Sequence, residues 1–252
     1  MSNRYSIQEK LSYIGSEGQK KISSAHVAIV GCGALGGNLA TFMTRIGTGA
    51  LTLIDYDFPE ESNLPRQPLY TEDDVKNQIP KVKAAEMKLC SINSACKISA
   101  HNTKLTFENA ERLLGNADLI LDGTDNLTAR HIINEVSIKK SIPWIYGGVS
   151  GTVGMTMNIV PGKTCCFSCI FPDFSPEFAP YYPKDIGIIA TLPALVASIQ
   201  ATEALKILLE TNDYHNKLKY FDIWTHQITQ IHVTRDPACT VCQKKKFRFL
   251  ET

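Results

Sequence analysis

Short apolar runs alternate with longer amphipathic stretches along the front of the chain. The apolar runs typical of buried strands are residues 26–30, 51–55 and 119–122. The helix patterns that follow them are residues 34–45, 81–91 and 127–139. Alternation of this kind predicts a parallel sheet with helices packed against it. Past Pro143 the pattern changes to extended segments at 144–146 and 153–160, which we expect to continue the sheet in antiparallel fashion.

The longest apolar stretch, residues 186–209, is predicted to be a buried helix. It contains Gln200, Glu203 and Lys206, which are unfavourable in a membrane span. Thr191 stands where a helix cap is needed, and Pro193 is tolerated in a first helical turn.

Composition and charge limit the class of protein without naming a function. The 252 residues are 44% hydrophobic and 20% charged, which excludes a disordered or fibrous chain. A formal net charge of +1 gives no general attraction to nucleic acid or to an anionic membrane. We expect one domain over residues 1–252, with an N-terminal helical segment (1–24), a nucleotide-binding Rossmann-like half (25–146), and a remainder (147–252) of antiparallel strands, cysteine pairs and the buried helix.

Two Cys-x-x-Cys pairs lie far apart in the sequence, Cys166 with Cys169 and Cys239 with Cys242. Each spacing lets one turn aim two sulfurs at one point, so the four thiolates can close a tetrahedron around Zn²⁺. The first ten residues lack the apolar stretch of a secretion signal, so we expect a reducing, cytoplasmic setting in which zinc is favoured over disulfides. A closed four-sulfur site predicts a structural metal, and the alternative is two unrelated thiol pairs.

A glycine-rich loop, Gly31-Cys32-Gly33-Ala34-Leu35-Gly36, follows the first strand pattern and opens a helix pattern. Glycines at this turn allow close approach of the backbone to phosphate, and the helix start supplies free amides. The next strand pattern ends in Asp55, where a carboxylate can accept hydrogen bonds from ribose hydroxyls. The alternative is a glycine turn that serves only to pack helix on strand.

Three further features suggest a triphosphate site and not a simple dinucleotide pocket. Arg66, in the segment Asn63 to Gln67, and Lys81, at a helix start, would supply fixed positive charge. The segment Asp122 to Asn126 ends an apolar strand, where a carboxylate can hold Mg²⁺ against phosphates. Taken singly, Arg66 and Lys81 also fit solvated surface charges, and Asp125 also fits a helix cap.

These motifs together resemble the ThiF/MoeB/HesA family, the bacterial relatives of ubiquitin-activating enzymes. The resemblance covers almost the whole chain, and the matching segments are 4–6, 15–19, 31–36, 55–57, 63–67, 81–82, 122–126 and both cysteine pairs. It implies ATP-dependent adenylation of the C-terminal carboxylate of a small ubiquitin-fold carrier such as ThiS or MoaD. It also implies a homodimer and a carrier tail that ends in Gly-Gly.

The resemblance assigns a role to individual residues. It places Gly31, Gly33 and Gly36 in the phosphate loop, Asp55 on the ribose with Asp57 nearby, and Asp125 on Mg²⁺ with Asn126 beside it. It makes Asn63, Arg66, Gln67 and Lys81 the contacts of the triphosphate. The catalytic residues would be Arg66, Lys81 and Asp125.

The sequence departs from the family pattern at two positions. Members usually read Arg-Tyr-x-Arg-Gln near the start, with the second arginine reaching the partner's ATP, and here Ile7 replaces it. Arg4, Lys10 or another cation would have to substitute, or adenylation would proceed with one charge fewer. Pro183 stands where many relatives have a cysteine for sulfur transfer, so we expect no covalent thioester or persulfide on this chain and a separate sulfur donor.

Three other functions stay open at this point. An NAD-dependent oxidoreductase would use the glycine loop and Asp55 but has no need of Arg66, Lys81 and Asp125. An enzyme that adenylates a ribosomal peptide in antibiotic biosynthesis shares the fold and the chemistry but differs in its acceptor. A degenerate scaffold that pairs with an active partner would explain Ile7.

Overall fold

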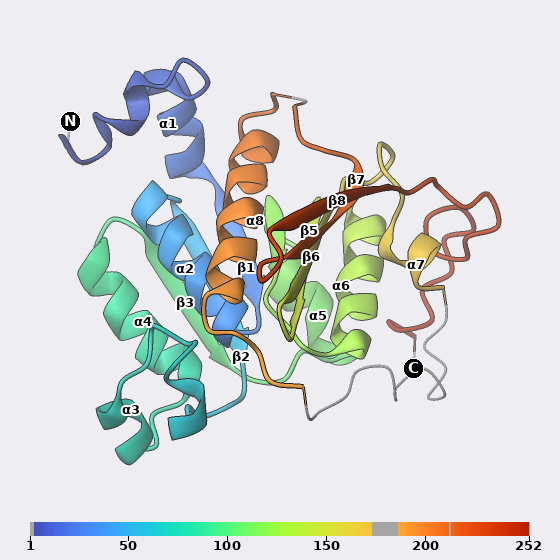
Figure 1. The fold of residues 1–252 in the computed structure, drawn as a ribbon. Helices are drawn as coiled ribbons and strands as arrows, with labels where there is room; N and C mark the ends of the chain where they lie inside the picture. Colours follow the sequence, from blue (N-terminus) through green and yellow to red (C-terminus); the bar gives the residue numbers. More distant parts are fainter. Residues whose placement is uncertain (1–2, 173–185, 212, 252) are drawn as a thin grey trace.

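The computed structural model describes residues 3–172, 186–211 and 213–251 (Figure 1). The strands are β1 (His26–Val30), β2 (Ala50–Asp55), β3 (Lys97–Asn102), β4 (Leu119–Asp122), β5 (Trp144–Ser150), β6 (Val153–Ile159), β7 (Lys217–Asp222) and β8 (Gln227–His232). The α-helices are α1 (Gly15–Ser24), α2 (Ala34–Ile46), α3 (Glu72–Lys76), α4 (Lys81–Ile92), α5 (Phe107–Leu114), α6 (Leu127–Lys140), α7 (Phe167–Ile170) and α8 (Leu192–Leu208). Short 3₁₀ turns are η1 (Asn3–Tyr5), η2 (Gln8–Lys10) and η3 (Glu61–Asn63).

The strands form one sheet in the order β3-β2-β1-β4-β5-β6-β7-β8. The first five strands are parallel, and β6, β7 and β8 then add in antiparallel fashion. The chain proceeds from β1 to β2 and β3 on one side and to β4 on the other. The strand order therefore reverses between β1 and β4, where a crevice for ligands opens at the carboxyl ends of parallel strands.

Alternate residues of the parallel strands feed two separate hydrophobic cores, as a side-chain period of two requires. On one face, Val27 and Ile29 of β1 pack with α2, α4 and α8. On the other face, Ala28 and Val30 pack in the core built by α5, α6 and the cysteine-rich C-terminal region. Figure 1 shows these helices covering the sheet on both sides. Burial on both faces explains why these strands read as unbroken apolar runs.

The predicted fold class is confirmed, and β1 and β4 begin and end where the sequence pattern placed them. One detail was wrong: β5 is parallel to β4, through the pairs Ile120 with Trp144 and Leu121 with Ile145, so the antiparallel part begins only at β6. The sequence pattern also missed β3, β7 and β8, whose residues are mostly exposed or half-buried and lack an apolar run.

The long apolar stretch forms α8, whose Gln200 and Glu203 are buried in hydrogen bonds, as a buried helix requires. Thr191 occupies the N-cap position but its side chain makes no capping hydrogen bond. Within the described residues, no helix is both long and apolar enough to cross a membrane.

Candidate active site and metal centre

A pocket of about 360 Å³ opens at the carboxyl ends of β1, β2, β4 and β5, at the reversal of strand order. Its walls come from the glycine loop, from the segments after β2, β3 and β4, and from strands β5 and β6. Of the residues proposed from the sequence, those that line it are Gly31, Gly33, Asp55, Asp57, Arg66, Gln67, Lys81, Asp125 and Asn126.

The glycine loop is a close contact between backbone segments. Gly31 has φ +84°, and a methyl group there would lie 2.6 Å from the carbonyl oxygen of Gly123. A methyl group on Gly36 would lie 1.8 Å from the carbonyl oxygen of Gly31, so Gly36 lets α2 pack against the loop from behind the pocket. At Gly33 the nearest atom would be Gln67 Nε2 at 3.7 Å, so this glycine leaves open space where a ligand can approach the backbone.

The N-terminus of α2 faces the pocket with Gly33 as its cap, and no side chain caps its first amides. Unpaired amides at the start of a thirteen-residue helix form a binding site for phosphate.

Asp55, at the end of β2, holds the glycine loop in place. Its Oδ2 accepts a hydrogen bond of 2.6 Å from the Cys32 amide, and its Oδ1 accepts one of 2.8 Å from the Asp57 amide. Burial raises the pKa of Asp55, and these two hydrogen bonds act against the shift. Each carboxylate oxygen has further lone pairs, so the group fits the ribose-binding role that the resemblance implies.

The two predicted cations, Lys81 and Arg66, both line the pocket but differ in their partners. Lys81 is almost buried, and its ammonium lies 3.3 Å from an Asp57 oxygen. Arg66 donates to the Ser62 carbonyl over 2.6 Å. The side-chain oxygen of buried Gln67 has no hydrogen-bond partner in the described structure, and an orphaned acceptor in a pocket wall fits a polar ligand.

Two residues that the resemblance assigned to the nucleotide have structural roles here. Asn63 does not line the pocket; it completes a capping box with Glu60 at η3. Asn126 does line the pocket, but its Oδ1 caps α6 by accepting a 3.1 Å hydrogen bond from the Ala129 amide. Asp125, beside it, is exposed, and among the described residues no hydrogen bond to its carboxylate is recorded. Its oxygens are thus available as ligands for a hard cation.

Sequence reasoning missed two groups of pocket residues. One is Arg130, which forms a buried ion pair with Asp122 under the pocket; no motif marks this arginine, because α6 also buries the polar residues His131, Asn134 and Glu135. The other is the wall beyond the nucleotide loop, which no motif marked, and which consists of Tyr146, Gly148, Val149, Ser150, Val153, Met155 and Ile188.

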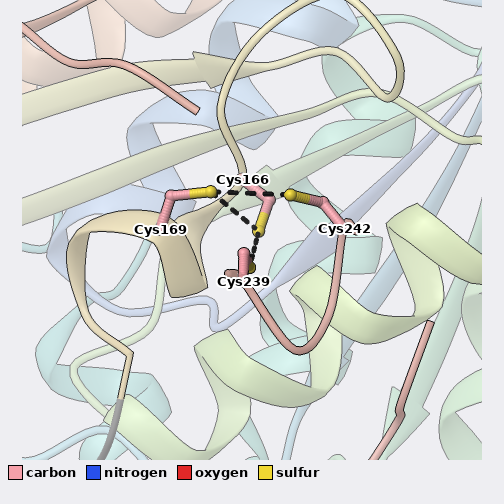
Figure 2. A group of neighbouring side chains, drawn as sticks. All are labelled: Cys166, Cys169, Cys239 and Cys242. Atoms are coloured by element: carbon pink, nitrogen blue, oxygen red, sulfur yellow. Dashed lines mark hydrogen bonds between the residues drawn. The ribbon is translucent and has the colours of Figure 1, made fainter. Parts of the chain in front are cut away.

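The four predicted metal ligands converge on one point, as Figure 2 shows. The recorded sulfur–sulfur distances are 3.8 Å for Cys166–Cys169, 3.7 Å for Cys166–Cys239 and 3.5 Å for Cys169–Cys242. A tetrahedron with Zn–S bonds of about 2.3 Å has edges of about 3.8 Å. The cluster therefore has the size and the ligand set of a structural zinc site.

The four sulfurs of this cluster differ in their pKa shifts: burial acts to raise the pKa of Cys239, but hydrogen bonds from the Cys242 and Val241 amides hold it below its ordinary value. Burial, followed by the neighbouring sulfurs, holds the pKa of Cys166 far above its ordinary value. Burial and then the hydrogen bond with Cys169 raise the pKa of Cys242 to about 12. A divalent cation at the centre would lower the pKa of these thiols by stabilising the thiolates.

The sequence departs from the family pattern at Ile7 and at Pro183, and the structure describes only the first of these residues. Ile7 is 74% exposed, and Arg4 donates to the Ile92 carbonyl over 2.8 Å, so neither residue lines this chain's pocket. Pro183 lies outside the described residues. Cys165 is buried beside Met157, and burial raises its pKa to about 11, which is the behaviour of a packed side chain and not of a nucleophile.

A doubly wound sheet with a glycine loop at a helix start, a carboxylate at the end of β2 and two cationic side chains in a pocket at its switch point is typical of nucleotide-binding α/β proteins. Comparison with known proteins narrows this class: the model of the ThiF family matches residues 5–241, and the chain belongs to that family.

Named relatives support the same assignment. The chain is 39% identical to the sulfur carrier protein ThiS adenylyltransferase of Bacillus subtilis, over 99% of this chain and 74% of the relative. It is 33% identical to the sulfur carrier protein adenylyltransferase of Thermus thermophilus, over 95% and 90% respectively. Among solved structures, Escherichia coli MccB with AMPCPP and MccA matches with a TM-score of 0.83 and 26% identity, over 96% of this chain and 74% of that one.

Proposed function

We propose that this chain is an ATP-dependent adenylyltransferase that activates the C-terminal carboxylate of a small ubiquitin-fold sulfur-carrier protein as an acyl-adenylate. One observation carries the proposal: Lys81, Arg66, Asp125 and the N-terminus of α2 converge on one pocket that also holds the ribose carboxylate Asp55. The names of the relatives point to the same reaction and the same class of acceptor.

The chemistry follows from the charges in the pocket. The acceptor carboxylate is ionised at neutral pH and attacks the α-phosphorus of ATP without a general base, and pyrophosphate leaves. Lys81 and Arg66 stabilise the charge that grows on the leaving group. Mg²⁺, with Asp125 as its ligand from this chain, would neutralise phosphate charge when bound.

The acceptor is expected to enter as an extended tail. The pocket wall on the β5–β6 side contains Gly148 and several small or apolar side chains, and Asp125 lines the same pocket. An extended Gly-Gly tail fits such a wall because it presents no side chains. The sulfur would come from a separate donor, since Cys165 is buried and Pro183 replaces the usual cysteine.

The test is exchange of labelled pyrophosphate into ATP with carrier proteins ending in Gly-Gly. We expect exchange that requires both Mg²⁺ and the carrier and that Asp125→Ala abolishes. Asp213→Ala, which removes an exposed carboxylate outside the pocket, is the matched control and should leave exchange intact. Absence of exchange with every carrier, together with no heat of ATP binding, would refute the proposal.

A second acceptor class is favoured by one comparison. Escherichia coli MccB, which matches this fold, was solved with AMPCPP and MccA. Exchange supported by short ribosomal peptides but not by Gly-Gly carriers would select this alternative. Nicotinamide binding without any ATP binding would instead select an oxidoreductase.

We also propose that the chain works as a homodimer with a structural zinc ion in each subunit. Ile7, Leu11 and Tyr13 are exposed apolar residues on the N-terminal segment, and contact with a partner subunit would cover them. The unpaired state of all eight cysteines fits a reducing, cytoplasmic setting. Sedimentation of the protein at micromolar concentration tests the dimer.

A further inference from the structure

A buried ion pair lies under the nucleotide pocket and joins its two walls. Arg130, on α6, and Asp122, at the end of β4, are 3% and 0% exposed, and Arg130 Nε donates to Asp122 Oδ2 over 2.9 Å. Two buried charges persist only when their remaining hydrogen-bonding groups are satisfied. The partners that satisfy these two groups therefore show what the pair holds in place.

Arg130 also donates hydrogen bonds to two backbone carbonyl oxygens. Its Nη2 donates to the Thr124 carbonyl over 2.6 Å and to the Gly147 carbonyl over 2.9 Å. Its guanidinium carbon lies 5.0 Å from the centre of the Tyr146 ring. One side chain thus joins the loop after β4 to strand β5.

Asp122 holds the same loop from its other side. Its Oδ1 accepts hydrogen bonds from the Thr124 amide (2.9 Å) and the Thr124 hydroxyl (2.7 Å). Its Oδ2 also receives a longer bond of 3.4 Å from the Gly147 amide. Thr124 is therefore fixed through its amide, its hydroxyl and its carbonyl, and Asp125 is the next residue.

We propose that Arg130 is a positioning residue that fixes the Asp125 carboxylate relative to the acceptor-side strand β5. The inference rests on the proposed function, in which Asp125 holds the metal and β5 leads the acceptor tail in. Arg130 lines the pocket, yet its recorded donors point at protein oxygens, so it does not replace the arginine missing at Ile7.

The expected size of the effect follows from the geometry of in-line transfer. A misplacement of about 1 Å between reacting groups costs on the order of 100-fold in rate. Loss of a group that orients a metal ligand costs roughly 10- to 100-fold in metal affinity or activity. An arginine that touched the phosphates would instead weaken ATP binding directly.

The decisive variant is Arg130→Lys, which keeps a positive charge beside Asp122 but cannot bridge Thr124 and Gly147 with a planar fork. Mn²⁺, followed by electron paramagnetic resonance, reports metal binding to the enzyme–ATP complex without any turnover. We expect Mn²⁺ affinity to fall roughly 10-fold and pyrophosphate exchange to fall roughly 10- to 100-fold. ATP affinity in metal-free buffer should stay within about 2-fold of wild type, because the nucleotide contacts lie elsewhere in the pocket.

Two further variants keep the test decisive. Thr124→Val removes only the 2.7 Å hydroxyl bond to Asp122 and should fold even if Arg130→Lys does not; we expect a smaller loss in the same direction, about 3-fold. Glu203→Gln alters a comparably buried carboxylate outside the pocket and should leave Mn²⁺ affinity unchanged.

Unchanged Mn²⁺ affinity in folded Arg130→Lys and Thr124→Val would overturn the inference. So would a loss of metal-free ATP affinity with normal exchange at saturating ATP. If wild type showed no exchange with any acceptor while Arg130→Lys still lost Mn²⁺ affinity, the adenylation proposal would fail and the positioning role would stand.

Discussion

Removal of one cysteine from the four-sulfur cluster should destabilise the whole C-terminal region. Cys166 and Cys239 are 73 positions apart, and a metal between them closes a loop of that length. Loop-closure entropy for about 70 residues corresponds to roughly 4 kcal/mol at 25 °C. Since a domain is stable by only about 5–15 kcal/mol, this is a large share of its free energy of unfolding.

The contacts of helix α6 show which segments a metal at this cluster would support. The Asn134 side chain accepts a hydrogen bond from the Phe167 amide over 3.0 Å and donates one to the Ser168 hydroxyl, which fixes the segment of Cys166 and Cys169. Glu135 accepts a hydrogen bond from the Phe249 amide over 2.8 Å, which fixes the segment after Cys242. Without a metal, these hydrogen bonds and the packing of His131 against Phe167 and Phe249 would have to hold both segments on α6.

We therefore expect Cys239→Ser, or treatment with a strong zinc chelator, to lower Tm by roughly 10 °C or more, at about 2–4 °C per kcal/mol for a chain of this size. Elemental analysis should find one zinc per chain in wild type and none in the variant. Cys90→Ser, at an exposed cysteine outside the cluster, is the control and should keep both zinc and Tm. A wild-type protein that stays metal-free when folded with excess zinc under reducing conditions would refute the reasoning.

Three other predictions follow from single residues. Gly36→Ala should lose roughly 1–3 kcal/mol or more, because its methyl would lie 1.8 Å from the Gly31 oxygen, whereas Gly37→Ala, with a nearest contact of 3.6 Å, should keep its Tm in the same thermal scan. Burial raises the pKa of Glu135 from about 4.5 to about 7, so the native state binds the proton more tightly and the free energy of unfolding should fall as pH rises from about 4.5 to 7. Glu135→Gln should flatten that pH dependence in denaturant titrations, and an unchanged slope would contradict this prediction. Ile7→Arg should raise the pyrophosphate exchange rate, while Leu11→Arg, at another exposed apolar position, should not.

The parts of the fold that sequence reasoning found are those where one rule dominates. Strands β1 and β4 are buried on both faces, so their apolar runs were unambiguous. Strand β3, with the burial of an edge strand, and β8, which is exposed along its whole length, carry no such run. Their place in the sheet comes from long-range pairing, with β2 and β7 respectively, which no local pattern encodes.

The candidate site divides in the same way. The glycines and carboxylates at strand ends could be predicted from the sequence, because the backbone conformation and the charge that the site needs there depend on local residues. The role of Arg130 was not readable, because it depends on Gly147, seventeen residues away, meeting the guanidinium in space. For Asn63 and Asn126 the motif was readable, but the structure shows their side chains bonded to backbone amides of the local chain.

Charge at the pocket explains why the missing arginine matters for mechanism. Lys81 is paired with Asp57 at 3.3 Å, so part of its charge is already offset before a nucleotide arrives. Arg130 is neutralised by Asp122. With Ile7 in place of an arginine, the proposed mechanism leaves stabilisation of the departing pyrophosphate to Arg66, to Lys81 and to a metal that Asp125 would hold. Dependence on Mg²⁺ should accordingly be steeper here than after Ile7→Arg, and the Mg²⁺ concentration for half-maximal exchange measures this directly. Equal half-maximal concentrations in the two proteins would show that position 7 does not contribute to the phosphate site.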